Sequence, residues 1–252
     1  MKLTIVTISY KNLDELKETL DSINMQRENC YENILVLSGY SKNEKKQLIQ
    51  SYSNNYRKFY WDVDNSLFNA MNIGIKKSTG EFLLFLNAGD CFVSEDNISN
   101  INKNILVNMC TSFKTYQIFK KIRIIRENFP SNKLFFRSGL RTLPPHQGFI
   151  APNKKEIYFN EDLKVSADND WMNKNITKYG INYNNSIIVD FKLGGQSTFP
   201  TIKIIFIKLK HEKFIRFIIE CIKYLYSLFV SREFYFITMA KIRGYKILRR
   251  EE

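Results

Sequence analysis

The chain has 252 residues and a formal net charge of +13 at pH 7, from 38 lysine and arginine residues against 25 aspartate and glutamate residues. Its hydrophobic content of 44% is too high for an intrinsically disordered chain. Four scattered cysteines without a C-x-x-C motif and only two histidines argue against a disulfide scaffold, a zinc site and a multi-histidine metal centre. The basic excess points to an anionic partner: nucleic acid, a phosphorylated ligand or a membrane surface.

Short apolar runs alternate with amphipathic stretches over residues 1–90. Leu3–Ile8 is apolar throughout, as expected for a strand of a parallel sheet that is covered on both faces. The next stretch has leucine or isoleucine at positions 13, 16, 20 and 23, which is the spacing of an amphipathic helix. This β-α-β series predicts an α/β fold with a mainly parallel central sheet flanked by helices. The predicted strands are Leu3–Ile8, Ile34–Leu37, Lys58–Val63 and Glu81–Leu86, and the predicted helices are Asn12–Asn24, Glu44–Tyr52 and Phe68–Lys77.

Polar segments follow each of these strands, namely Thr7–Tyr10, Ser38–Ser41, Asp64 and Asn87–Asp90. Ligands of parallel sheets bind beyond the carboxyl ends of the strands, so we expect these segments to form one binding edge. Neither G-x-G-x-x-G nor G-x-x-x-x-G-K-[ST] is present, which argues against a dinucleotide fold and a P-loop NTPase. A phosphate-bearing ligand would therefore need a metal ion or basic side chains to neutralise its charge.

The following residues, up to 199, are less regular. Lys120–Arg126 fits either an amphipathic strand or a solvated basic edge. Two prolines precede His146 and Gln147 and hold them in a rigid loop. A helix is predicted to begin near Asp168, with that residue or Ser166 as its N-cap.

Two long motifs are distinctive in this sequence. Asp64–Ile75 is similar to D-x-G-I-Y-D-A-M-N-x-G-I, and Ser78–Asp90 is similar to A-x-G-x-[YF]-x-x-F-L-N-[AS]-[GD]-D. Both patterns are typical of the family 2 glycosyltransferases, and the chain most resembles the branch that builds colanic-acid-like and other bacterial surface polysaccharides. Three shorter motifs agree in order: Pro145–Gln147 (P-H-Q), Phe159–Glu161 with Ala167–Asp170 (F-D-E…A-D-Y-D) and Leu193–Ser197 (G-G-x-S).

The resemblance covers residues 1–199 and implies a GT-A fold. A nucleotide-sugar-binding half would span residues 1–96 and an acceptor-binding half residues 97–199. The family transfers a sugar, with inversion, from a nucleoside-diphosphate sugar donor to an acceptor hydroxyl. The Q-x-x-R-W motif of its processive members is absent here, which favours a single addition to a glycan or lipid-linked acceptor.

Two aspartates match the chemistry of this family. Asp168 matches the catalytic base, which must take the proton of the acceptor hydroxyl as the new bond forms, and Asp170 is the competing candidate. Asp90 matches the last carboxylate of a D-x-D-type motif, which holds Mn²⁺ or Mg²⁺ against the donor diphosphate. A role in a turn or a helix cap is the alternative for each of these carboxylates.

The remaining site predictions concern the two substrates. Asp64 matches a nucleotide-contacting residue of the family, and Asn72 is a further candidate or, alternatively, a polar residue of a surface helix. His146 and Gln147 are assigned to contacts with the acceptor or the diphosphate, with a structural histidine as the alternative. The other nucleotide-sugar candidates lie at the strand ends: Thr7, Ser9, Ser38 and Asn87.

One departure from the family pattern leaves two alternatives open. After the second strand, D-G-x-S-x-D is replaced by the sequence of residues 38–43, SGYSKN, so both carboxylates are missing. The nucleobase of the donor is therefore open, and a catalytically degenerate domain that acts as an interaction protein is an alternative. A nucleic-acid-binding module is the other alternative, although no known nucleic-acid-binding motif is present.

The basic charge is concentrated in the tail. Residues 200–252 carry +7 of the net charge and leave +6 for residues 1–199. Three charges interrupt the apolar stretch Phe214–Val230, and Leu3–Ile8 is too short for a signal peptide, so we expect a cytoplasmic chain without a spanning helix. The stretch predicts an amphipathic helix at the inner face of the cytoplasmic membrane, with packing on the domain or in a homodimer as the alternative. Its polar stripe is Lys213, Arg216, Glu220, Lys223 and Ser227.

Overall fold

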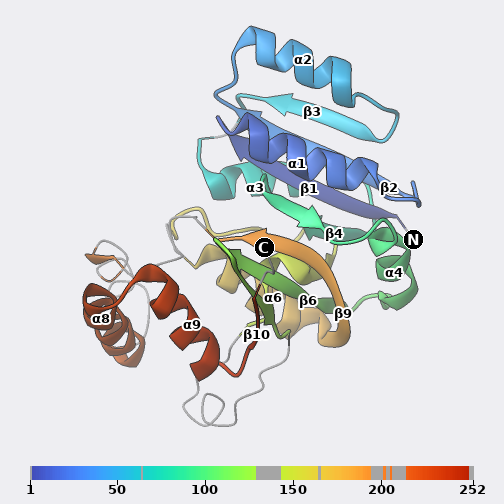
Figure 1. Ribbon diagram of the computed structural model, residues 1–252. Helices are drawn as coiled ribbons and strands as arrows, with labels where there is room; N and C mark the ends of the chain where they lie inside the picture. Colours follow the sequence, from blue (N-terminus) through green and yellow to red (C-terminus); the bar gives the residue numbers. More distant parts are fainter. Residues whose placement is uncertain are drawn as a thin grey trace.

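The computed structural model describes residues 2–63, 65–128, 143–163, 166–193, 201–202, 205 and 214–249. Within these residues one ten-stranded sheet forms the centre of the molecule, and helices flank it (Figure 1). The strands follow one another in the order β10, β7, β6, β8, β4, β1, β2 and β3, and β9 pairs with both β5 and β6.

The N-terminal half is the parallel unit that the sequence predicts. β1 pairs in parallel with β2 and β4, and β2 pairs in parallel with β3. The side chains of β2 explain this arrangement, because Ile34 and Val36 pack in the cluster with α3, whereas Leu35 and Leu37 pack with α1 and α2. The elements are β1 (Leu3–Tyr10), α1 (Leu13–Asn24), β2 (Tyr31–Ser38), α2 (Lys42–Tyr52), β3 (Arg57–Trp61), α3 (Leu67–Lys77) and β4 (Phe82–Phe85).

The following half makes the sheet mixed, so the prediction of a mainly parallel sheet is wrong. Five of the nine strand pairings are antiparallel. A tight turn at Lys120 and Lys121 folds β7 back on β6, so the structure has the amphipathic-strand alternative for Lys120–Arg126. The elements are β5 (Asp90–Phe92), α4 (Asn97–Asn104), β6 (Cys110–Phe119), β7 (Ile122–Arg126), the 3₁₀ turn η1 (His146–Gly148), β8 (Phe149–Pro152), α6 (Ala167–Tyr179) and β9 (Ile181–Lys192).

Residues 214–249, the described stretch at the C-terminal end, contain two helices and a strand. α8 (Phe214–Phe229) matches the predicted helix, α9 (Arg232–Ile242) follows it, and β10 (Lys246–Arg249) pairs antiparallel with β7. α9 packs on the sheet through Phe236 and Ala240, which contact Phe119 and Ile124. The segment is therefore part of the folded body, at the opposite end of the molecule from α2 (Figure 1). No helix in the described ranges has the length and apolar character needed to cross a membrane.

Candidate functional site

The carboxyl ends of β1, β2 and β4 meet at one edge, as the predicted binding edge requires. Tyr10 pairs with Ser38 in the β1–β2 ladder, and the Ala88 N–H, just after β4, donates to the Ile8 carbonyl at 3.1 Å. Ser9 shares a 2.5 Å hydrogen bond with the Tyr40 hydroxyl. Three of the predicted donor-binding segments are thus neighbours, whereas Asp64 lies outside the described residues.

Two predicted donor contacts are engaged inside the protein instead. Thr7 is fully buried, and its hydroxyl accepts a hydrogen bond from Asn33, which also binds the guanidinium of Arg57 at 2.7 Å. The Asn72 side chain bonds both backbone groups of Phe159, at 2.8 and 3.0 Å, and donates to Glu161 at 2.7 Å. This amide ties α3 to the segment before α6, so the structure supports neither a nucleotide contact for Asn72 nor a place on the helix surface.

A carboxylate that the sequence reasoning missed lies beside the end of β2. Asp62, directly after β3, accepts the backbone N–H of Gly39 at 3.0 Å and forms an ion pair with Lys45. The hydrogen bonds from Lys45 and Gly39 hold the pKa of this carboxyl below its usual value. Asp62 therefore supplies a carboxylate, paired with Lys45, near the segment in which this chain lacks both carboxylates of the family pattern. Its position near the end of the third predicted strand is the feature of the sequence that could have identified Asp62 as a residue of the binding edge.

Asp90 and Asn87 lie together after β4. Asp90 is 3% exposed and accepts the backbone N–H of Asn87 at 3.1 Å, so it also fills the predicted alternative role of a turn carboxylate. Burial raises its pKa well above the usual value; the Asn87 N–H partly opposes this, and the nearby charge of Glu15 on α1 adds a smaller rise. Glu15 is a second carboxylate near Asp90. No motif around Asp90 predicts it, because it lies on α1, in a distant part of the sequence.

The residues around Asp90 fit a hard divalent cation in their donor chemistry. The side-chain oxygen of Asn87 is shielded from solvent and has no hydrogen-bond partner among the described residues. An amide oxygen without a hydrogen-bond partner and a buried carboxylate together provide the kind of oxygen ligands that Mg²⁺ and Mn²⁺ prefer. In the described ranges no group of three or more histidine, cysteine or acidic side chains is available, so most ligands would have to come from diphosphate and water.

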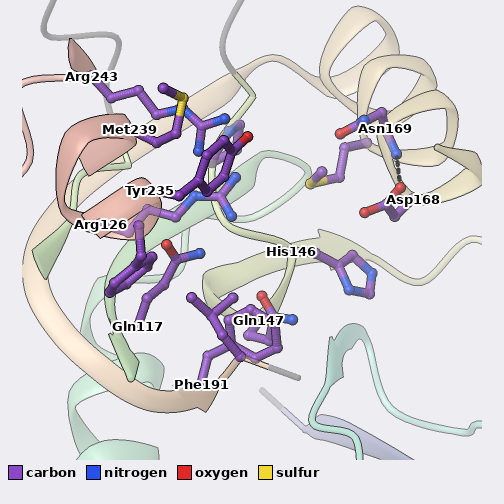
Figure 2. A pocket seen from close by; sticks show the side chains of 14 residues that line it. Gln117, Arg126, His146, Gln147, Asp168, Asn169, Phe191, Tyr235, Met239 and Arg243 are labelled. Carbon is purple, nitrogen blue, oxygen red and sulfur yellow. Dashed lines mark hydrogen bonds between the residues drawn. The ribbon is translucent and has the colours of Figure 1, made fainter. Parts of the chain in front are cut away.

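A cavity of about 250 Å³ contains the acceptor-side candidates (Figure 2). Asp168 and Asn169 enter it from the first turn of α6, and His146 and Gln147 enter it from η1. The opposite wall is built by α9, although the sequence predicts a separate tail there. Three sequence-predicted residues thus share one pocket. Its other lining residues are Gln117, Arg126, Pro144, Met172, Phe191, Leu193, Tyr235, Phe236, Met239 and Arg243.

Asp168 is the better placed of the two candidate bases. Its carboxylate lines the cavity and accepts only the backbone N–H of Asn169, at 2.9 Å, among the hydrogen bonds of the described residues. Asp170 does not line the cavity and forms an ion pair with Lys174 at 2.7 Å. Ser166 occupies the N-cap position of α6, although its side chain makes no capping hydrogen bond, and Asp168 is the second residue of the helix.

His146 is held rigidly between aromatic rings. Its imidazole stacks on Phe85 at 5.4 Å and meets the edge of Trp171 at 5.9 Å. It is 6% exposed, and its Nε2 has no hydrogen-bond partner among the described residues. Burial lowers the pKa of His146 and so favours the neutral ring, while the charge of Asp168 acts in the opposite direction. A side chain at Gly148 would come within 2.4 Å of the Phe113 carbonyl, so glycine lets η1 lie against β6.

Comparisons with known proteins identify the family of the chain. Residues 4–158 match the model of the family described as glycosyl transferase family 2. An uncharacterized glycosyltransferase of Mycobacterium tuberculosis, found in two strains, is 28% identical over 93 residues, which are 37% of this chain and 36% of the relative. The chain matches about a third of the length of these curated relatives.

Similar solved structures share the fold. Residues 1–349 of S. aureus TarS align with a TM-score of 0.59 and 20% identity, over 76% of this chain and 60% of that chain. The same protein in complex with UDP-GlcNAc aligns with a TM-score of 0.57 and 18% identity, over 79% and 60%. The mannosyltransferase PcManGT from Pyrobaculum calidifontis, in complex with GDP-Man and Mn²⁺, aligns with a TM-score of 0.55 and 13% identity, over 78% and 58%.

These neighbours show the GT-A fold, and the family model adds the sequence evidence. The matched residues run from β1 to the segment between β8 and α6, which includes the parallel unit, its binding edge and His146. Since this match covers more than half of the sequence, the chain belongs to glycosyl transferase family 2.

Proposed function

We propose that the protein is an inverting, non-processive glycosyltransferase that moves one sugar from a nucleoside-diphosphate sugar to an acceptor hydroxyl. The observation that carries this proposal is the convergence of Asp168, His146 and Gln147 on one cavity in a chain of this family. The complexes of its structural neighbours with UDP-GlcNAc and GDP-Man support a nucleotide-sugar donor. The resemblance to colanic-acid-type enzymes supports a role in bacterial surface polysaccharide or glycolipid synthesis.

The cavity supplies the groups that such a transfer needs. The oxygen of the acceptor hydroxyl attacks the anomeric carbon of the donor sugar, and Asp168 accepts the proton of that hydroxyl. The bond from that carbon to the diphosphate breaks on the opposite side, so the configuration inverts and the nucleoside diphosphate leaves. His146, which aromatic rings hold in place, and Gln147 orient the acceptor through hydrogen bonds.

A divalent cation, Mn²⁺ or Mg²⁺, belongs to the proposed reaction. When bound, it would neutralise the charge that develops on the leaving diphosphate. Asp90 and the side-chain oxygen of Asn87 are the residues that would hold it. The complex of PcManGT with Mn²⁺ supports this part of the proposal.

The apolar face of α8, formed by Ile218, Ile222, Leu225 and Phe229, supports attachment to an anionic membrane surface. These side chains are 42–85% exposed. Glu220 and Lys223, on the other side of the helix, form a 2.7 Å ion pair and are only 13% and 23% exposed. The helix thus turns its apolar side outward, which a helix in water avoids. The basic excess of this segment complements the charge of an anionic leaflet.

Substitution of the proposed base tests the main assignment. Asp168→Asn should lower the transfer rate by about 10²–10⁴-fold, because the amide cannot take the proton. Donor affinity, measured by calorimetry with and without Mn²⁺, should remain because Asp168 lies on the acceptor side. Asp170→Asn is the matched control and should retain activity. Wild-type turnover in Asp168→Asn would reject this mechanism, and absent donor binding in the wild type would favour a degenerate domain.

A further inference from the structure

The cavity that holds Asp168 has a strongly basic side. Among its fourteen lining residues, Asp168 is the single acidic one, whereas Arg126 and Arg243 are basic. Arg126 ends β7, and Arg243 is the C-cap of α9, so a sheet strand and a C-terminal helix supply one arginine each. Figure 2 shows both arginines on one side of the pocket and Asp168 with His146 on the other.

The polar groups of this cavity are incompletely satisfied within the protein. The Nε atom of Arg126 is shielded from solvent and has no hydrogen-bond partner among the described residues. The Nε2 atom of His146, on the opposite side of the cavity, is also shielded from solvent and has no hydrogen-bond partner among these residues. Buried donors and acceptors are normally paired, so Arg126 and His146, whose side chains line the cavity, keep hydrogen-bonding capacity that the described residues do not use.

We propose that Arg126 and Arg243 bind a phosphoryl group of the acceptor while its reacting hydroxyl faces Asp168. This inference rests on the proposed transferase function and adds the chemical class of the acceptor, a phosphorylated sugar. The planar guanidinium group offers paired N–H donors that match phosphate oxygens better than any neutral side chain does. A cavity of about 250 Å³ accommodates a ligand the size of one sugar with its phosphate.

The separation of charges also fixes the direction in which the acceptor lies. A phosphoryl group is attracted to the two arginines and repelled by the carboxylate of Asp168, so the reversed orientation is disfavoured. The uncharged end of the sugar then meets Asp168, Gln147 and His146. α9 becomes a specificity element, because Arg243 and Tyr235 line the cavity from that helix.

Calorimetric titration with glucose 1-phosphate as the probe tests the proposal without any transfer reaction. We expect binding to the wild type, no measurable binding of methyl glucoside, and affinities lowered about tenfold by Arg126→Gln or Arg243→Gln. Arg243→Lys keeps the positive charge but lacks the planar guanidinium group, so its affinity for glucose 1-phosphate should lie between those of the wild type and Arg243→Gln. Asp168→Asn should bind the probe more tightly, because it removes the repelling charge. Lys241→Gln, an exposed position of α9 outside the cavity, is the matched control.

Two results would overturn the proposal. One is equal affinity of the wild type and both glutamine variants, each shown by circular dichroism to be folded, for glucose 1-phosphate. The other is equal affinity for inorganic phosphate and the sugar phosphate, which would identify a simple anion site. Nucleotide release from a donor sugar tests the proposed function separately, so loss of that activity with intact probe binding would reject the function and keep the pocket.

Discussion

Single residues of this chain have roles that depend on contacts from distant sequence positions. Asp168 and His146 could be predicted because they stand in family motifs, and the structure brings both to one cavity. Asn72 stands in an equally clear motif, yet its amide is used to bind Phe159. Arg126 and Arg243 stand in no motif, and only the pairing of β10 with β7 and the packing of α9 bring them together. The sequence shows that both residues are basic, but it does not show that they line the same cavity.

Glu32 illustrates at this scale how a buried carboxylate stabilises the sheet. It is 2% exposed and accepts hydrogen bonds from Lys58 at 2.9 Å, the Thr79 N–H at 2.7 Å and the Thr4 hydroxyl at 2.9 Å. Burial alone would raise its pKa, but these hydrogen bonds outweigh burial and lower the pKa from 4.5 to about 2. The ionised form is therefore bound more favourably in the folded state than in the unfolded state.

The pH dependence of stability should reveal this carboxylate. Since its pKa is lowered on folding, its contribution is present above pH ~4.5 and is lost as the pH falls towards ~2, by about 3 kcal/mol. Urea unfolding at pH 7 and at about pH 2.5 should show a smaller loss of unfolding free energy in Glu32→Gln than in the wild type. Asp14→Asn, at an exposed position, should behave as the wild type. Identical losses in Glu32→Gln and the wild type would contradict the assignment.

The secondary-structure elements divide into those that local sequence specifies and those that need long-range pairing. β1, β2 and β4 are buried on both faces and are visible as apolar runs, which is why the parallel half was predicted. β9 contains three asparagines, which disfavour strands, and it is held by its pairing with β6 and β5. Local propensity does not specify such partners, so the sequence does not predict the strand pairings that make the sheet mixed. β10 was missed for the same reason, because its four residues form a strand only beside β7.

The docking of α9 can be tested with two phenylalanines of the same helix. Phe236 is 7% exposed and packs against Phe119 with ring centroids 5.7 Å apart, whereas Phe234 is 54% exposed. Phe236→Ala should lower the unfolding free energy by about 3 kcal/mol, because it leaves a cavity. Phe234→Ala should change it by less than about 0.5 kcal/mol. Chemical denaturation measures both values, and equal effects of the two substitutions would show that α9 does not pack as described.

At the scale of the whole molecule, the net charge of +13 is less informative than its distribution. The C-terminal segment carries +7, yet the structure does not leave it as a free basic arm. Its α9 builds one wall of the cavity with Asp168, and its α8 lies at the outside of the molecule, beyond α9 (Figure 1). A membrane bound through α8 would therefore lie close to the acceptor side of the site. This arrangement suits an acceptor that is itself attached to lipid.

Vesicle binding tests this arrangement directly. The wild type should sediment with vesicles that contain about 30% anionic lipid and much less with neutral vesicles, because basic residues near the surface each add about 1 kcal/mol. The double substitution Ile222→Asp with Leu225→Asp removes two exposed apolar side chains, each expected to contribute about 1.5–3 kcal/mol when buried, so binding should fall about a hundredfold. Leu106→Asp with Val107→Asp, at an exposed apolar pair far from α8 in the sequence, is the matched control. A wild type that ignores anionic vesicles but elutes as a dimer, and becomes monomeric in the α8 variant, would instead assign the apolar face of α8 to a second copy of the chain.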